Sequence, residues 1–269
     1  MSKVVHVLGN GDKAIYYTRE QRNGIKLLCN MPPFEVPRNE VFGTCMVDFK
    51  MMMALSEGSI ALDQYDWILG TRPRIWMYEQ SSFYLKYARC VKEFYTHVPD
   101  YAGNPTNFNC GHMAVHYAAS RHKADEVHLY GFDTIFDFNM RSVTDLVLSS
   151  DRTTTNNYRL LNNWRPVWRD IFREFPQTKF VLHHNHNKLK IPLLDNMEVI
   201  VYNDTLTKAQ TVDDESDISD GRGMDNQIVT PGAEAPMNRA TRRRIDAIER
   251  RHGKKLSTFV ENKKKWFFL

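Results

Sequence analysis

The chain has 269 residues, of which 42% are hydrophobic and 12% aromatic, and its net charge is +4. This length and composition suffice for one large packed domain with an appendage. No apolar run approaches the roughly 20 residues that cross a bilayer, so no transmembrane segment is expected.

The N-terminus enters an apolar run directly, without a signal-peptide pattern. The four cysteines, Cys29, Cys45, Cys90 and Cys110, are scattered and lack the spacing of a metal site. In a chain without a secretion signal such cysteines are expected to stay reduced. We therefore expect a cytoplasmic protein with four free thiols.

Short apolar runs predict seven strands, at residues 4–8, 25–29, 44–47, 67–69, 126–130, 179–182 and 199–202. Helical spacing of apolar residues predicts helices at residues 50–57, 81–92, 111–122 and 164–175. This alternation favours an α/β fold over residues 1–202, with a single Rossmann-like, mostly parallel sheet and helices on both faces.

The charge is concentrated after this domain. Residues 203–236 hold eight acidic and two basic side chains, a net charge of −6, and few large apolar residues, which predicts an acidic flexible linker. Residues 237–269 carry a net charge of +8 and predict a basic helical tail that ends in an aromatic peptide, Trp266-Phe267-Phe268-Leu269. The tail suits docking on a protein partner or on the chain itself, or binding to nucleic acid.

A glycine turn, Gly9-Asn10-Gly11, follows the first strand, at the edge where α/β sheets bind ligands. Glycine there lets a ligand approach the main chain closely, although ordinary strand-to-helix turns also use it. The second strand ends at Asn30, where an NAD site would have an acid. This disfavours a dinucleotide and suits a base or ribose edge, since an amide both donates and accepts.

A second group of polar residues opens the helix predicted at residues 111–122. Asn109, Cys110 and Gly111 stand at its start, where unpaired amides favour a phosphate. Asp133 follows the next strand, and either ligand binding or turn capping explains it.

In their order these motifs resemble bacterial sialyltransferases that act on surface oligosaccharides, and related glycosyltransferase-like proteins of bacteria and phages. In that family the motifs read Gly-Asn-Gly, Cys-Asn, Thr-Ser-Gly and Gly-Ile-Asp, and they surround CMP without an essential metal. The resemblance covers about residues 4–185. It implies a CMP-linked sugar donor as substrate and no separate cofactor. It places these residues at the nucleotide, with Asp133 nearby: Gly9, Asn10, Gly11 and Asn30 at the base and ribose, and Asn109, Cys110 and Gly111 at the phosphate.

The chain also departs from the family. Asn109-Cys110 replaces the Thr-Ser pair at the phosphate. The family has a catalytic histidine in the loop before its last long helix, whereas residues 149–163 contain Tyr158 and no histidine. Tyr158 suits a hydrogen bond to phosphate, but an unperturbed pKa of about 10 makes it a poor general base near neutral pH.

His183, His184 and His186 leave the carboxyl end of a predicted strand. His184 is our candidate for the missing base, because histidine titrates near neutral pH. A solvated loop and a metal site are the alternatives for this group. His112 and His116, on an apolar helix, favour a structural role.

Three arginines around the same loop, Arg152, Arg159 and Arg165, are expected to be open and to pair with a phosphate or an acceptor carboxylate.

Three hypotheses for the function follow from these candidates. The first is a nucleotide-sugar-dependent transferase with Asp133, Tyr158 and His184 as catalytic candidates. The second is a binding or assembly protein, such as a structural protein of a phage, that keeps the fold without the chemistry. The third is a transferase brought to DNA by its tail, which predicts salt-sensitive DNA binding.

Overall fold

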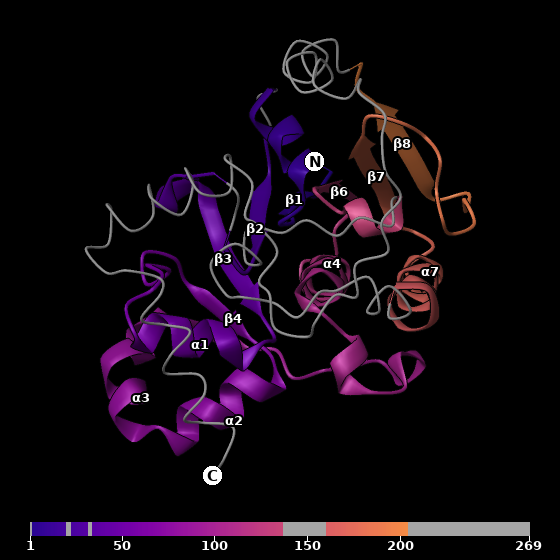
Figure 1. The fold of residues 1–269 in the computed structure, drawn as a ribbon. Coiled ribbons are helices and arrows are strands. Elements are labelled where there is room, and N and C mark those ends of the chain that lie inside the picture. The colour runs from indigo at the N-terminus through magenta and orange to yellow at the C-terminus, as the bar shows by residue number, and fades with distance from the viewer. Residues whose placement is uncertain (1, 20–22, 32–33, 137–159, 204–269) are drawn as a thin grey trace, which may run out of the picture. The chain divides into compact units, whose positions relative to one another are not determined.

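A computed structural model of the chain describes residues 2–19, 23–31, 34–136 and 160–203 (Figure 1). The chain divides into two compact units, residues 1–202 and 203–269. The acidic linker and the basic tail predicted above lie outside the described residues, apart from Asn203.

The first unit is built on one sheet of eight strands in the order β5-β4-β3-β2-β1-β6-β7-β8. Every neighbouring pair is parallel, so the α/β Rossmann-like prediction is confirmed and the sheet is wholly parallel. The strands are β1 (Val4–Leu8), β2 (Ile25–Cys29), β3 (Val41–Met46), β4 (Trp67–Leu69), β5 (Val91–Phe94), β6 (Glu126–Tyr130), β7 (Lys179–His184) and β8 (Met197–Val201).

The connections contain short helices, with η marking 3-10 or π turns. The longer ones are η1 (Asp12–Arg19), α1 (Phe49–Ser56), α2 (Thr71–Glu79), α3 (Ser81–Tyr87), α4 (Cys110–Ser120), η8 (Leu160–Trp164) and α7 (Arg165–Glu174). The short turns are η2 (Arg38–Glu40), η3 (Ala88–Cys90), η4 (Asp100–Ala102), η5 (Pro105–Asn107) and η6 (Asp133–Ile135).

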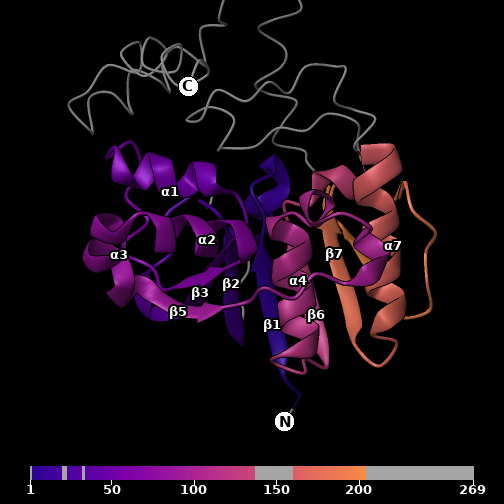
Figure 2. The ribbon, with the colours of Figure 1, turned by 90° about the horizontal axis from the view of Figure 1, so that it is seen from below.

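Strand alternation separates the two faces of the sheet. Val5 and Val7 belong to the core that contains α4 and α7 (Figure 2). His6, between them, meets Tyr17 of η1 and Tyr130, at ring-centre distances of 6.1 and 6.0 Å. Successive side chains of a strand point to opposite faces, so η1 covers the face opposite α4. The prediction of helices on both faces is confirmed.

The segment 81–92 is the main error of the element assignment. It was predicted as one helix, but the helix ends at Tyr87 and the chain passes through η3 into the edge strand β5. Helix α2 was missed as well. Pairing of Val91 with Trp67 of β4 decides for a strand here, and a four-residue edge strand leaves little periodic signal in the sequence.

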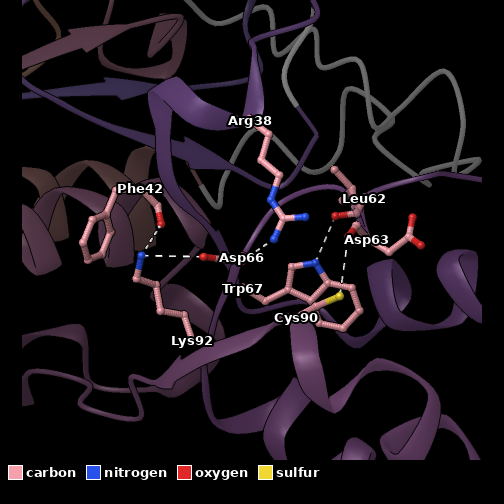
Figure 3. Close-up of polar contacts among 8 residues, drawn as sticks. All are labelled: Arg38, Phe42, Leu62, Asp63, Asp66, Trp67, Cys90 and Lys92. Atoms are coloured by element: carbon pink, nitrogen blue, oxygen red, sulfur yellow. Dashed lines mark hydrogen bonds and ion pairs between the residues drawn. The ribbon is translucent and has the colours of Figure 1, made fainter.

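The amino edge of the sheet is held by an exposed charge cluster (Figure 3). Asp66, just before β4, lies 3.0 Å from the Arg38 guanidinium and 3.7 Å from the Lys92 ammonium. Lys92 also donates to the Phe42 carbonyl (2.9 Å) and lies 3.6 Å from that ring's centre. These contacts tie the starts of β3, β4 and β5 together, which is a structural role.

Candidate functional site at the carboxyl edge of the sheet

The order of the strands reverses between β1 and β6. After β1 the chain moves outward through β2 to β5, and after β6 it moves the other way through β7 to β8. Ligands of open α/β sheets bind outside the carboxyl ends of the strands at such a reversal. Most of the residues singled out in the sequence meet here.

The glycine turn after β1 lies directly against the loop after β6. The Gly9 amide donates to the Tyr130 carbonyl (2.7 Å) and the Gly11 amide to the Gly131 carbonyl (3.0 Å). A Cβ on Gly9 would stand 2.6 Å from the Gly131 carbonyl oxygen, and one on Gly11 2.6 Å from Asp133 Oδ2. The glycines therefore allow two protein loops to touch, and a ligand contact at Gly9, Asn10 or Gly11 stays a prediction.

Asn30, just after β2, is held by its main chain and its side chain. Its φ is 53°, its amide donates to the Cys45 carbonyl (3.0 Å), and its carbonyl accepts from Thr44 Oγ1 (2.6 Å). Its Oδ1 accepts from the Cys110 thiol at 2.9 Å. This bond joins the end of β2 to the start of α4, and a contact of Asn30 with a ligand stays a prediction.

Helix α4 begins with a complete capping box. Asn109 Oδ1 accepts from the His112 amide (3.0 Å), and His112 Nδ1 accepts from the Asn109 amide (3.1 Å). Burial lowers the pKa of His112 to about 3, so this ring is neutral and structural, as expected. Among the described residues none accepts from the amides of Cys110 and Gly111, which are the orphan donors that suit a phosphate.

Removing the cap of α4 should be measurable. Asn109→Ala is expected to lower the free energy of unfolding by about 1–2 kcal/mol in urea titrations, because the His112 amide loses its acceptor. Asn109→Asp keeps a side-chain oxygen as the acceptor, so its free energy of unfolding is expected to stay close to that of wild type. Equal losses for both variants would argue against the cap.

The Cys110 thiol is part of the packing. It is buried, it accepts from the Val47 amide (3.3 Å), and burial raises its pKa to about 12. Burial also raises the pKa of Cys29, Cys45 and Cys90. The predicted free thiols are thus present, and they are inert by position.

Thiol titration tests this burial. We expect a disulfide reagent such as Ellman's to modify none of the four cysteines in the native protein and all four in denaturant. Rapid modification of even one thiol before unfolding would contradict the structure.

Asp133 begins η6 and is 91% buried. Its carboxyl group accepts from the main-chain amides of Lys13 and Asp12, which is the capping role weighed in the sequence. Burial, and then the charge of Asp12, raise its pKa to about 7. Among the described residues Oδ1 has no hydrogen-bond partner, and His184 Nε2 lies 4.0 Å from it.

His184 ends β7 and is 99% buried, as is His183 beside it. The solvated-loop interpretation of these two histidines is therefore wrong, because β7 continues through both. His184 stacks on Phe136 at 4.0 Å, and its Nδ1 accepts from the His186 amide at 3.4 Å. A neutral ring that accepts at Nδ1 carries its proton on Nε2, toward Asp133.

Arg165 corrects a second expectation. It was predicted to be open, but it begins α7 and is 95% buried, with Nε donating to the Thr134 carbonyl at 3.1 Å. It therefore braces the residue after Asp133. Tyr158, Arg152 and Arg159 lie outside the described residues, and their roles stay predictions.

Trp168, on the helix predicted at residues 164–175, lies in the core and also belongs to the site. Its ring lies 3.3 Å from where a Cβ on Gly111 would stand, and it packs edge-on against Phe132. The buried indole Nε1 has no hydrogen-bond partner in the part of the chain that the structure describes. Helical spacing marks Trp168 as apolar core and carries no signal for this second contact.

No family model, curated protein or solved structure matches this chain. Within the described ranges, no three histidine, cysteine or acidic side chains come together as metal ligands. No helix among those residues is both long and apolar enough to cross a membrane.

Proposed function

We propose that the carboxyl edge of the sheet binds a nucleotide sugar, CMP-linked by preference, and transfers the sugar to an acceptor. The support is the ordered set of motifs that resembles the sialyltransferase-like glycosyltransferases, found on a sheet of the matching class.

One observation carries this proposal: five separate segments converge at the strand reversal. The Gly11 turn contacts Asp133, Asn30 binds Cys110, and Asp133 faces His184. The orphan amides of α4 supply a place for phosphate beside the Asn30 amide. An Asn in place of an acid favours a mononucleotide over NAD.

The proposed chemistry uses Asp133 as the general base in place of His184, because a neutral His184 that accepts at Nδ1 already carries its proton on the Nε2 that faces Asp133. The acceptor hydroxyl attacks the anomeric carbon, the bond from that carbon to the phosphate oxygen breaks, and the hydroxyl proton passes to the carboxylate. A pKa of about 7 lets this group accept and release a proton near neutral pH. His184, 4.0 Å away, is placed to stabilise the carboxylate charge.

Calorimetric titration with CMP, UDP and GDP tests the binding step. We expect CMP to bind, NAD to fail, and Asn30→Asp to bind CMP at least tenfold more weakly, because the variant loses the amide donor and adds a charge. Asn104→Asp makes the same chemical change at an exposed cap and is expected to bind as wild type. Absence of binding by all three nucleotides would end the proposal.

A binding or assembly protein is the second candidate. It is favoured by the internal use of the motif residues, since Asn109 caps a helix and the glycines admit neighbouring loops. Nucleotide binding without sugar transfer, unchanged in Asp133→Asn, would select it.

A further inference from the structure

Three buried histidines lie on the sheet face that η1 covers, away from the site just described. His6 of β1 and His128 of β6 are direct partners in register, and His183 stands on β7. Their exposed fractions are 2%, 8% and 1%. Buried imidazoles need hydrogen-bond partners, and His128 and His183 are partners of each other.

His128 and His183 form the middle of a continuous hydrogen-bonded chain. The Tyr202 hydroxyl lies 2.9 Å from His183 Nδ1, and His183 Nε2 lies 2.8 Å from His128 Nδ1. His128 Nε2 lies 2.6 Å from Glu126 Oε1. Glu126 starts β6 and Tyr202 follows β8, so the chain runs along the sheet from its carboxyl toward its amino edge.

Simple valence rules give this chain a direction. An ionised Glu126 only accepts, so His128 carries a proton on Nε2. If the ring is neutral, its Nδ1 accepts, and His183 must donate from Nε2. Nδ1 of His183 then accepts from the Tyr202 hydroxyl. Two neutral rings thus satisfy every bond of the chain.

We propose that Tyr202, His183, His128 and Glu126 form a buried site that takes up a single proton and relays it along the sheet. A proton received by the Tyr202 oxygen releases the original hydroxyl proton to His183 Nδ1. The Nε2 proton of His183 passes to His128 Nδ1. The added charge then rests on His128, now protonated at both nitrogens, beside the Glu126 carboxylate.

None of the bonds that link these four residues is lost in this step, because the bonds Tyr202–His183 and His183–His128 reverse while the His128–Glu126 bond stays. Tyr202 becomes an acceptor from His183 Nδ1, and His183 remains neutral. The single positive charge sits 2.6 Å from a carboxylate, the arrangement in which a buried imidazolium is stabilised. From His128 the proton reaches solvent through Glu126, whose side chain is 30% exposed.

The neighbours limit the uptake to one proton. The ring centre of His6 lies 4.8 Å from that of His128, and its Nε2 contacts the Asn23 carbonyl (2.8 Å). His6 Nδ1 lies 3.3 Å from the Tyr130 hydroxyl, so both ring nitrogens of His6 contact groups outside the hydrogen-bonded chain. A second charge on His6 or His183 would meet that of His128 in a buried place.

Other described charged and titratable groups lie around the hydrogen-bonded chain. Tyr17 lies against His6, and Tyr16 stacks on Tyr202 at 4.2 Å, with the Lys13 ammonium 5.9 Å from the Tyr16 ring. Lys179 is the partner of Glu126 in the strand register. The Lys179 ammonium lies 2.6 Å from Glu198 Oε2.

Long-range proton–nitrogen spectra of the full chain, labelled with ¹⁵N-histidine and recorded from pH 8 to pH 5, test the site. Histidine signals are assigned from single His→Gln variants. We expect both rings to carry Nε2 protons at high pH. On acidification His128 should become doubly protonated while His183 switches to an Nδ1 proton and stays neutral. Independent titration of the two rings, or an unchanged His183 tautomer, would overturn the relay.

Two variants test the two ends of the hydrogen-bonded chain, Glu126 and Tyr202, one at a time. Glu126→Gln removes the counter-charge, and the pH of proton uptake is expected to fall by at least one unit, a tenfold loss of proton affinity. Tyr202→Phe keeps the stacked ring and is expected to abolish the His183 tautomer switch. Asp66→Gln, in the exposed charge cluster before β4, is the control and is expected to leave both signals as in wild type. An unshifted titration in Glu126→Gln would refute the proton site even if both variants fold.

Discussion

Replacing Gly131 with alanine is expected to lower the free energy of unfolding by about 4 kcal/mol. Its φ is +73°, which an L-residue adopts at a cost of about 1–2 kcal/mol. The added Cβ would also stand 2.8 Å from the Ala14 Cβ and 2.9 Å from the Gly11 carbonyl oxygen, and such overpacking costs about 1–3 kcal/mol. Urea unfolding measures the loss.

Gly103→Ala separates these two causes. Gly103 also has a positive φ, of +66°, but a Cβ there would have nothing within 4 Å. With a ψ of −45° its backbone lies in a sparsely populated region, so the variant is expected to show the backbone cost alone, about 1–3 kcal/mol. Equal losses of unfolding free energy in the two variants would contradict the close packing of the Gly9–Gly11 turn against the loop after β6.

The second large effect concerns the ionisation of Asp133. Its folded-state pKa of about 7 stands above the ordinary value of 3.8, so the native state binds more protons than the unfolded chain between these values. Stability from this group is therefore highest below about pH 4 and falls as the pH rises through 7. At 1.36 kcal/mol per pKa unit, the loss is up to about 4 kcal/mol.

Asp133→Asn is expected to remove this fall. Urea unfolding at pH 4.5, 6 and 8 gives the slope for each protein, and the variant should lose less stability than wild type over that range. Asp66→Asn, in the exposed cluster at the amino edge, removes a carboxylate far from the site and should keep the wild-type slope. If Asp133→Asn kept the wild-type dependence of stability on pH, ionisation of Asp133 would not be the cause of the fall.

The two effects have a common origin. The loop contact made possible by Gly11 and Gly131 is the same contact that covers Asp133, since a Cβ on Gly11 would meet the Asp133 carboxyl group at 2.6 Å. Close packing at the strand reversal thus excludes water from the proposed base. We expect variants that loosen this packing to lower the pKa of Asp133 toward its ordinary value.

Much of the fold was predictable. Strands buried on both faces read as continuous apolar runs, and Val4–Leu8, Ile25–Cys29, Trp67–Leu69 and Glu126–Tyr130 have their predicted bounds. The placement of Asn30 and Asp133 at one edge of the sheet also followed from sequence, because the carboxyl ends of parallel strands share one edge. The edge strand β5 was not predicted, since its identity depends on pairing with β4.

The sequence by itself determined the α/β class, the strands of the sheet's centre and the edge that carries the polar motifs, because these follow from local periodicity and chain direction. Only the tertiary structure decided what each motif residue touches. Asn30 and its partner Cys110 are 80 residues apart in the sequence, and Tyr130 and its partner His6 are 124 residues apart. Burial of His184 and Arg165 likewise depends on distant segments, since solvent exclusion is a property of the assembled fold and leaves no local pattern in the chain.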